Sequence, residues 1–184
     1  MSKVYLFLAT GNEEIEALTV VDLLRRAGIC IETVSISDSL DVTGAHGIDV
    51  KADRLFKDVD FDDASMLVLP GGNPGYKNLG AFEPLMKLVT DFIHAGKYVA
   101  AICGAPTVLG KRNLLQGYTA CCYPDMEDAL LGANVSYDRV CVDRNLITSR
   151  GMGTAIDFSL EIIRILVNQE TADKLATGIV YRTK

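Results

Sequence analysis

Short apolar runs alternate with amphipathic stretches along this chain, and that alternation limits the folds it can adopt. Strand character is expected at residues 4–9, 31–36, 48–51, 66–69, 98–102, 116–122, 139–142 and 145–149. Helical spacing is expected at residues 13–27, 82–95, 154–167 and 170–177. Strands that alternate with helices indicate parallel βαβ units, so we predict an α/β fold with helices on both sheet faces. We expect one domain over residues 1–184.

Composition excludes several classes of protein. A net charge of −6 argues against nucleic acids and anionic membranes as partners, because neither would be attracted. No apolar run approaches membrane-spanning length, and we expect no secretory leader. The five cysteines form no Cys-x-x-Cys unit and only two histidines are present, which predicts no metal site and a reducing cytoplasmic location.

One cysteine stands where a strand turns into a helix. Cys103 follows the apolar run 98–102, and Pro106 then occupies a favoured first helical position. Small neighbours, Gly104 among them, allow a tight turn that leaves the sulfur uncovered. We favour a reactive thiol here over a buried structural cysteine, with a pKa in the roughly 3.5–7.5 range of activated cysteines.

The carboxyl ends of neighbouring parallel strands meet at one sheet edge, where sites of such folds lie. We therefore expect the turn at Gly11, the Pro70-Gly71-Gly72 turn and Cys103 to converge. Glu16 opens the helix after the first of these strands. It is either one of several acids that complement the helix dipole, or a protonated partner that donates a hydrogen bond to the thiolate.

Other residue types around these strand ends are less specific. Gly71 and Gly72 are either turn glycines or donors of backbone N–H groups to an oxyanion, and no Gly-x-Gly-x-x-Gly pattern supports a dinucleotide. His46 lies between glycines in a loop and is the freer of the two histidines. Tyr123 precedes Pro124, beside two cysteines at 121 and 122 that we interpret mainly as packing residues.

Several motifs in the chain resemble one known family. They are A-T-G-N-E-E-I-E, L-R-R-A-G-I, L-V-L-P-G-G-N-P-G, A-A-I-C-G-A-P and I-T-S-R-G-M-G-T-A-I-D-F. Together they look like the ThiJ/PfpI superfamily, in its DJ-one-like branch, and they run in order from the first strand to the last long helix. The resemblance implies a flavodoxin-like α/β sandwich and a homodimer without a cofactor.

The resemblance also assigns roles to residues. Cys103 matches the reactive cysteine of the family, Glu16 its protonated partner, and Gly72 with Gly104 the backbone donors around the sulfur. Arg26 matches an arginine near the dimer interface. His46 falls where relatives carry a residue that the second subunit brings to the pocket.

Three positions depart from patterns in related branches. Tyr123 stands where human-type members have a histidine, so no Cys–His pair can form there. Met152 replaces a proline between two glycines, which reshapes the rim of the pocket. Gly104, in place of the histidine of protease-like members, argues against a peptidase, and a later histidine needed by class I amidotransferases is missing.

Two functions follow from the resemblance. The first is a cofactor-independent glyoxalase or deglycase, in which Cys103 adds to methylglyoxal or to a glycated product and protects against carbonyl stress. The second is a redox-sensing or chaperone-like stress protein, whose Cys103 is oxidised to sulfinate with little turnover. Both functions need the same cysteine, so the motif alone does not separate them, and no residues support a reaction of thiamine biosynthesis.

Overall fold

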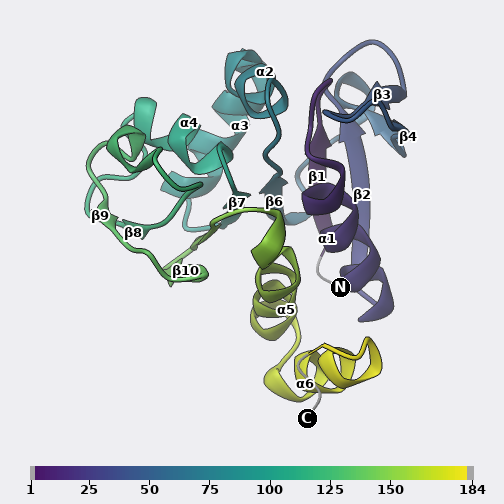
Figure 1. The fold of residues 1–184 in the computed structure, drawn as a ribbon. Coiled ribbons are helices and arrows are strands. Elements are labelled where there is room, and N and C mark those ends of the chain that lie inside the picture. Colours follow the sequence, from purple (N-terminus) through teal and green to yellow (C-terminus); the bar gives the residue numbers. More distant parts are fainter. Residues whose placement is uncertain (1–2, 182–184) are drawn as a thin grey trace.

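The computed structural model describes residues 3–181, and its centre is a seven-stranded sheet (Figure 1). The strand order is β10-β11-β7-β6-β1-β2-β5. All neighbours are parallel except the antiparallel pair β10 and β11. The strands span Lys3–Leu8 (β1), Cys30–Ser35 (β2), Arg54–Leu55 (β5), Ala64–Leu69 (β6), Tyr98–Ile102 (β7), Val140–Asp143 (β10) and Leu146–Ser149 (β11). The predicted, mostly parallel sheet is confirmed.

Helices cover both faces of this sheet, as expected for a flavodoxin-like α/β fold (Figure 1). On one face α1 and α5 pack against each other, and α6 packs on α5. On the other face lie α2, α3 and α4. The helices span Glu14–Arg26 (α1), Gly75–Ala81 (α2), Glu83–His94 (α3), Ala105–Lys111 (α4), Ala155–Leu166 (α5) and Gln169–Gly178 (α6).

Two hydrophobic clusters form the core, one on each side of the sheet. Along β1 the side chains alternate between them, because successive residues of a strand point to opposite faces. Tyr5 and Phe7 join the cluster under α2, α3 and α4, whereas Val4 and Leu6 join the cluster under α1 and α5. Both faces of β1 are therefore buried, which explains its run of apolar residues.

Small elements complete the chain. They are the antiparallel pair β3 (Asp41–Thr43) and β4 (Asp49–Lys51), the parallel pair β8 (Thr119–Ala120) and β9 (Asn134–Val135), and 3-10 turns at Phe56–Asp58, Glu127–Ala129 and Met152–Thr154. Across residues 3–181 we find no helix with the length and apolar character needed to cross a bilayer.

One predicted strand is shorter in the structure, and one helix that we did not predict is present. The strand predicted at 116–122 is reduced to the two residues of β8, because Gly117 turns the chain with φ 70° and the Cys121 N–H donates to the Thr148 hydroxyl, 3.0 Å away. The helix α2 was not predicted. It contains Gly75 and Gly80, and glycine is a poor helix former.

Candidate active site at the carboxyl ends of β1, β6 and β7

Cys103 occupies the one-residue step between β7 and the Gly104 that caps α4. Its φ is 65°, a left-handed conformation that is costly for a residue with a side chain and that recurs at functional sites. Hydrogen bonds hold this turn on both sides. The Cys103 N–H donates to the carbonyl of Ser149, 2.9 Å away, and its carbonyl accepts from the Tyr123 N–H, also 2.9 Å away.

The predicted convergence of three strand ends is confirmed. The Glu13 N–H donates to the carbonyl of Gly71, 3.0 Å away, and the Gly75 N–H donates to the carbonyl of Gly11, 3.0 Å away. These two bonds tie the turn after β6 to the start of α1. A side chain at Gly71 would meet Cys103 directly, so the turns after β6 and β7 are in contact as well.

Glu16 lies in the first turn of α1 with 1% of its surface exposed. Its Oε2 accepts a hydrogen bond of 2.9 Å from the Gly71 N–H. A Cβ built on Gly71 would stand 2.5 Å from that Oε2 and 2.8 Å from the Cys103 Sγ. The Glu16 carboxyl and the Cys103 thiol therefore both occupy the space next to the Cα of Gly71, and position 71 has no room for a side chain.

Burial sets the acidity of this pair. Loss of solvation raises the pKa of the Glu16 carboxyl to about 7, because the charged form is disfavoured away from water. Burial raises the pKa of the Cys103 thiol to about 12, and the charge of Glu16 is the second largest cause of this rise. Hydrogen bonds from the N–H groups of Gly72 and Gly104 act in the opposite direction. The net rise is opposite to the acidic thiol that we predicted from the sequence.

The protonation state of Glu16 determines how easily the Cys103 thiol ionises. When Glu16 is protonated, its charge no longer opposes ionisation of the thiol, and its O–H can donate to the sulfur. The N–H groups of Gly72 and Gly104 already act on the sulfur in the same sense. A thiolate at Cys103 is thus compatible with a neutral Glu16 and is opposed by an ionised one.

Two tyrosines pack against glycines around the thiol. A Cβ on Gly104 would lie 2.8 Å from the ring of Tyr76, so that ring rests on the backbone next to Cys103. A Cβ on Gly151 would lie 3.4 Å from the ring of Tyr123. Tyr76 and Gly151 were not picked out as site residues from the sequence, because both contacts join residues distant in the chain.

His46 is anchored to the start of α1 in its own chain. Its N–H donates to Oε1 of Glu14 and its Nδ1 lies 2.8 Å from Oε2, with both oxygens on one buried side chain. Burial alone would raise the pKa of Glu14, but the hydrogen bonds from His46 lower it to about 2. The hydrogen bond to Glu14 likewise raises the pKa of His46. The structure does not bring His46 to the Cys103 of its own chain, and its approach to a second copy stays a prediction.

Glu13, Glu14 and His46 also form the group, within residues 3–181, whose ligand atoms lie close enough to hold a metal ion. These atoms all lie within 4.8 Å of one another. An imidazole nitrogen and carboxylate oxygens suit zinc and similar ions. The two hydrogen bonds between His46 and Glu14 already account for the arrangement without an ion.

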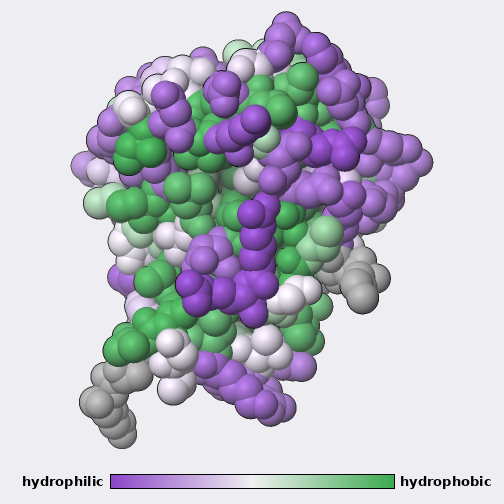
Figure 2. Space-filling model, turned by 90° about the vertical axis from the view of Figure 1, so that its right-hand side faces the viewer, coloured by the Kyte–Doolittle hydropathy of each residue, from purple (hydrophilic) through white to green (hydrophobic). Residues whose placement is uncertain are grey.

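Arg26 lies far along α1 from the thiol and pairs with Asp22, Nε to Oδ2 2.7 Å. It borders a groove of about 780 Å³ together with apolar side chains, among them Ile15, Leu18, Ile48, Ile156, Ile179 and Val180. Figure 2 shows patches of hydrophobic side chains between hydrophilic ones on the face that forms the right-hand side of Figure 1. The lining of this groove contains neither Cys103 nor Glu16.

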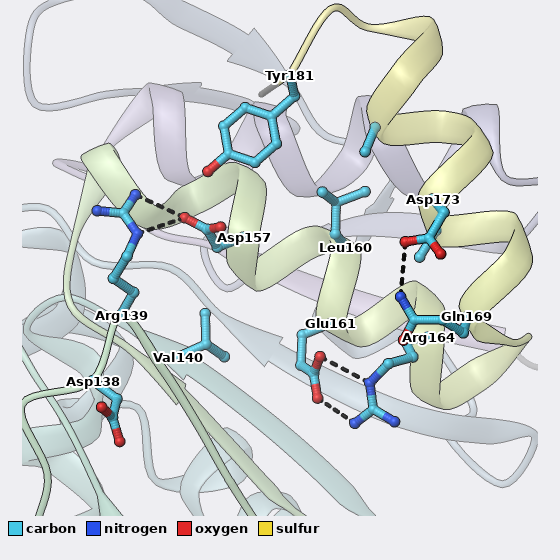
Figure 3. Close-up of a pocket in the computed structure, with 12 residues that line it drawn as sticks. Asp138, Arg139, Val140, Asp157, Leu160, Glu161, Arg164, Gln169, Asp173 and Tyr181 are labelled. Atoms are coloured by element: carbon cyan, nitrogen blue, oxygen red, sulfur yellow. Dashed lines mark hydrogen bonds and ion pairs between the residues drawn. The ribbon is translucent and has the colours of Figure 1, made fainter. Parts of the chain in front are cut away.

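A second cavity, of about 680 Å³, lies between β10, α5 and α6 (Figure 3). Its charged side chains have partners within the chain: Arg139 pairs with Asp157 at 2.7 Å and Arg164 with Glu161, while Asp138 and Asp173 accept hydrogen bonds from Ser136 and Gln169. It contains none of the residues expected at the active site. Polar groups that already have partners do not indicate a ligand here.

A cysteine at a strained strand-to-helix turn has a buried carboxyl and two backbone N–H donors beside it, on a flavodoxin-like sheet. Comparison with known proteins places it further. The model of the DJ-1/PfpI family matches residues 2–165. The chain belongs to the DJ-1/PfpI family.

Individual relatives agree with this placement. Protein DJ-1 homolog B of Arabidopsis thaliana is 36% identical over 182 residues, which are 98% of this chain and 42% of that protein. The chain therefore spans less than half the length of that relative. Glutathione-independent glyoxalase DJR-1.2 of Caenorhabditis elegans is 30% identical, over 89% of this chain and 87% of that protein. The structure of oxidized Toxoplasma gondii DJ-1 superposes with a TM-score of 0.95 at 36% identity, and all of both chains is covered.

Proposed function

We propose that this protein is a cofactor-independent glyoxalase, in which Cys103 attacks the aldehyde of methylglyoxal. The observation that carries the proposal is the buried Glu16 carboxyl, whose raised pKa of about 7 lets it hold or release a proton near neutral pH beside the thiol. The C. elegans relative that is named a glyoxalase supports the same chemistry.

The proposed reaction needs only these groups and water. The Cys103 thiolate, beside a protonated Glu16, forms a bond to the aldehyde carbon, and the electron pair of the C=O bond moves to the oxygen. The N–H groups of Gly72 and Gly104 stabilise the charge on this oxygen until it takes the proton of Glu16. The Glu16 carboxylate then removes the proton from that carbon and delivers it to the neighbouring carbon. The proton of the new hydroxyl passes to the neighbouring carbonyl oxygen, so the first carbon regains a C=O bond and the second becomes the alcohol carbon. A thioester of lactate results, and water hydrolyses it to lactate and free thiol.

A steady-state assay tests the proposal. Purified protein should consume methylglyoxal and release lactate without glutathione. Cys103→Ser and Glu16→Gln should each lower kcat/KM by at least about 100-fold, the lower range for loss of an acid–base group. Cys30→Ser, at an exposed cysteine on β2, is the matched control and should retain activity. Equal rates for wild type and Cys103→Ser would refute the proposal.

A second function, redox sensing or a chaperone-like stress role, is favoured by a specific observation. A half-buried Cys103 sulfur beside two N–H donors and a protonatable carboxyl suits a sulfinate, which needs donors for its oxygens. The Toxoplasma neighbour is described as oxidized. Slow turnover together with stoichiometric oxidation of Cys103 by peroxide, seen by peptide mass spectrometry, would select this function.

The remaining expectations belong to the same proposal. Proteins of the DJ-1 family are typically dimeric, and we propose a homodimer built on the apolar groove beside Arg26. Glycated products are proposed as further substrates of the same thiol. The free cysteines favour a reducing, cytoplasmic compartment. We propose that residues 1–184 act as one domain.

A further inference from the structure

We propose that Tyr123 determines the substrate preference of this site by offering an aromatic surface to aldehydes that carry a flat apolar group. The proposal rests on the proposed aldehyde chemistry at Cys103 and names the class of substrate, an aryl-substituted α-oxoaldehyde rather than the smallest one. It comes from the position of the Tyr123 ring and from its exposure.

The backbone of Tyr123 is fixed relative to the nucleophile. Its N–H donates to the carbonyl of Cys103, 2.9 Å away, and its carbonyl accepts from the Met126 N–H, 3.2 Å away. A residue tied directly to the strained turn of Cys103 moves with that turn. The backbone from which the Tyr123 ring projects is therefore held in direct contact with the turn that carries the thiol.

The ring lies at the edge of the buried carboxyl. The point where Gly151 would carry a Cβ is 3.4 Å and 3.7 Å from two carbons of the Tyr123 ring, and 3.8 Å from Oε1 of Glu16. Ring and carboxyl thus border the same small space. These are ordinary contact distances, so the absent side chain of Gly151 leaves room for about one methyl group next to both.

The ring is also available to a ligand. Tyr123 has 50% of its surface exposed, and Met152, next to Gly151 in the chain, has 57% exposed. A flat substituent on a substrate held at Cys103 would cover apolar surface that otherwise contacts water. Aromatic pairs add roughly 0.5–1.5 kcal/mol beyond burial, which corresponds to a preference of about 2- to 12-fold.

The test compares two aldehydes and four substitutions, three at Tyr123 and one control. We expect Tyr123→Ala to lower the ratio of kcat/KM for phenylglyoxal over methylglyoxal by about 2- to 12-fold. Tyr123→Phe keeps the ring and should keep the ratio. Tyr181→Ala removes a tyrosine of the distant cavity beside α6 and is the matched control. Because Tyr123 is half exposed, its variants should fold, and Tyr123→Leu gives a second, apolar replacement without a ring.

A second readout does not depend on turnover. Alkylation of Cys103 by phenacyl bromide and by bromoacetone, each normalised to free cysteine, should show the same fall in ratio for Tyr123→Ala. If wild type turns over neither aldehyde but the alkylation ratio falls, the proposed glyoxalase function is wrong and the aromatic subsite is supported. If neither ratio changes on loss of the ring, the role of Tyr123 is refuted, whether or not the protein is a glyoxalase.

Discussion

Replacement of Glu16 by glutamine should change how the stability of this protein depends on pH. The Glu16 side chain is buried, and burial raises its pKa from the ordinary value of 4.5 to about 7. Glutamine has nearly the same shape but does not ionise, and its amide oxygen can accept the hydrogen bond from Gly71. The substitution therefore removes the ionisation and keeps the packing.

The magnitude follows from the two pKa values. Between pH 4.5 and about 7 the unfolded chain has lost the Glu16 proton whereas the folded protein still holds it. Stability then falls by about 1.36 kcal/mol for each pH unit, or about 3 kcal/mol in all. The contribution of Glu16 is thus fully present below pH 4.5 and is lost as pH rises through 7, while Glu16→Gln shows no such loss.

Urea unfolding of both proteins at pH 4.5, 6, 7 and 8 measures the effect, since all other titrating groups cancel in the difference. The free energy of unfolding of Glu16→Gln should rise relative to wild type by about 3 kcal/mol across this range. Cys103→Ala should retain the pH dependence of wild type, because burial is the main cause of the raised carboxyl pKa. A difference that stays constant from pH 4.5 to 8 would refute the reasoning.

Four further outcomes are expected. Gly71→Ala places a methyl group within 2.8 Å of the Cys103 sulfur and should cost about 1–3 kcal/mol, seen as a lower Tm, with slower alkylation of the thiol. His46→Ala removes the ring hydrogen bond and a positive charge from buried Glu14 and keeps the backbone N–H bond, so its loss of stability should be larger at pH 5 than at pH 8 in urea titrations. Mild peroxide should oxidise Cys103 before the three buried cysteines, as peptide mass spectrometry would show. Leu18→Asp, in the apolar groove of α1, should give a monomer in sedimentation, whereas an unchanged dimer would place the interface elsewhere.

Much of the fold could be predicted because a strand that is buried on both faces has a nearly continuous run of apolar residues in the sequence. The runs that became β1, β6 and β7 are almost wholly apolar, and the helices between them have clear spacing. The failures have local causes. Two glycines in α2 weaken its helical signal in the sequence. The segment before Tyr123 is apolar because it is buried, and this led to the prediction of a strand although most of the segment is not one.

The members of the site could be predicted more easily than its electrostatics. Position at strand ends was enough to predict that the turns at Gly11 and Gly71 meet Cys103, whereas the resemblance to the family was needed to choose Glu16 as the partner of the thiol. Whether the pKa of the Cys103 thiol is raised or lowered depends instead on how much water reaches the sulfur and on the charge of Glu16. The spacing of residues in the sequence gives neither quantity. Likewise, His46 and Glu14 are 32 positions apart, so their hydrogen bonds leave no pattern in the sequence.

Stability and reactivity favour the same protonation state at this site. A neutral Glu16 removes the cost of a buried charge, and it also removes the repulsion that raises the pKa of the Cys103 thiol. Above pH 7 both advantages disappear together, since the carboxylate then opposes a second negative charge beside it. The reactivity of Cys103 should therefore rise less steeply with pH than that of a free thiol. Glu16→Gln should restore the steeper rise, because it takes away the charge that holds the thiol protonated.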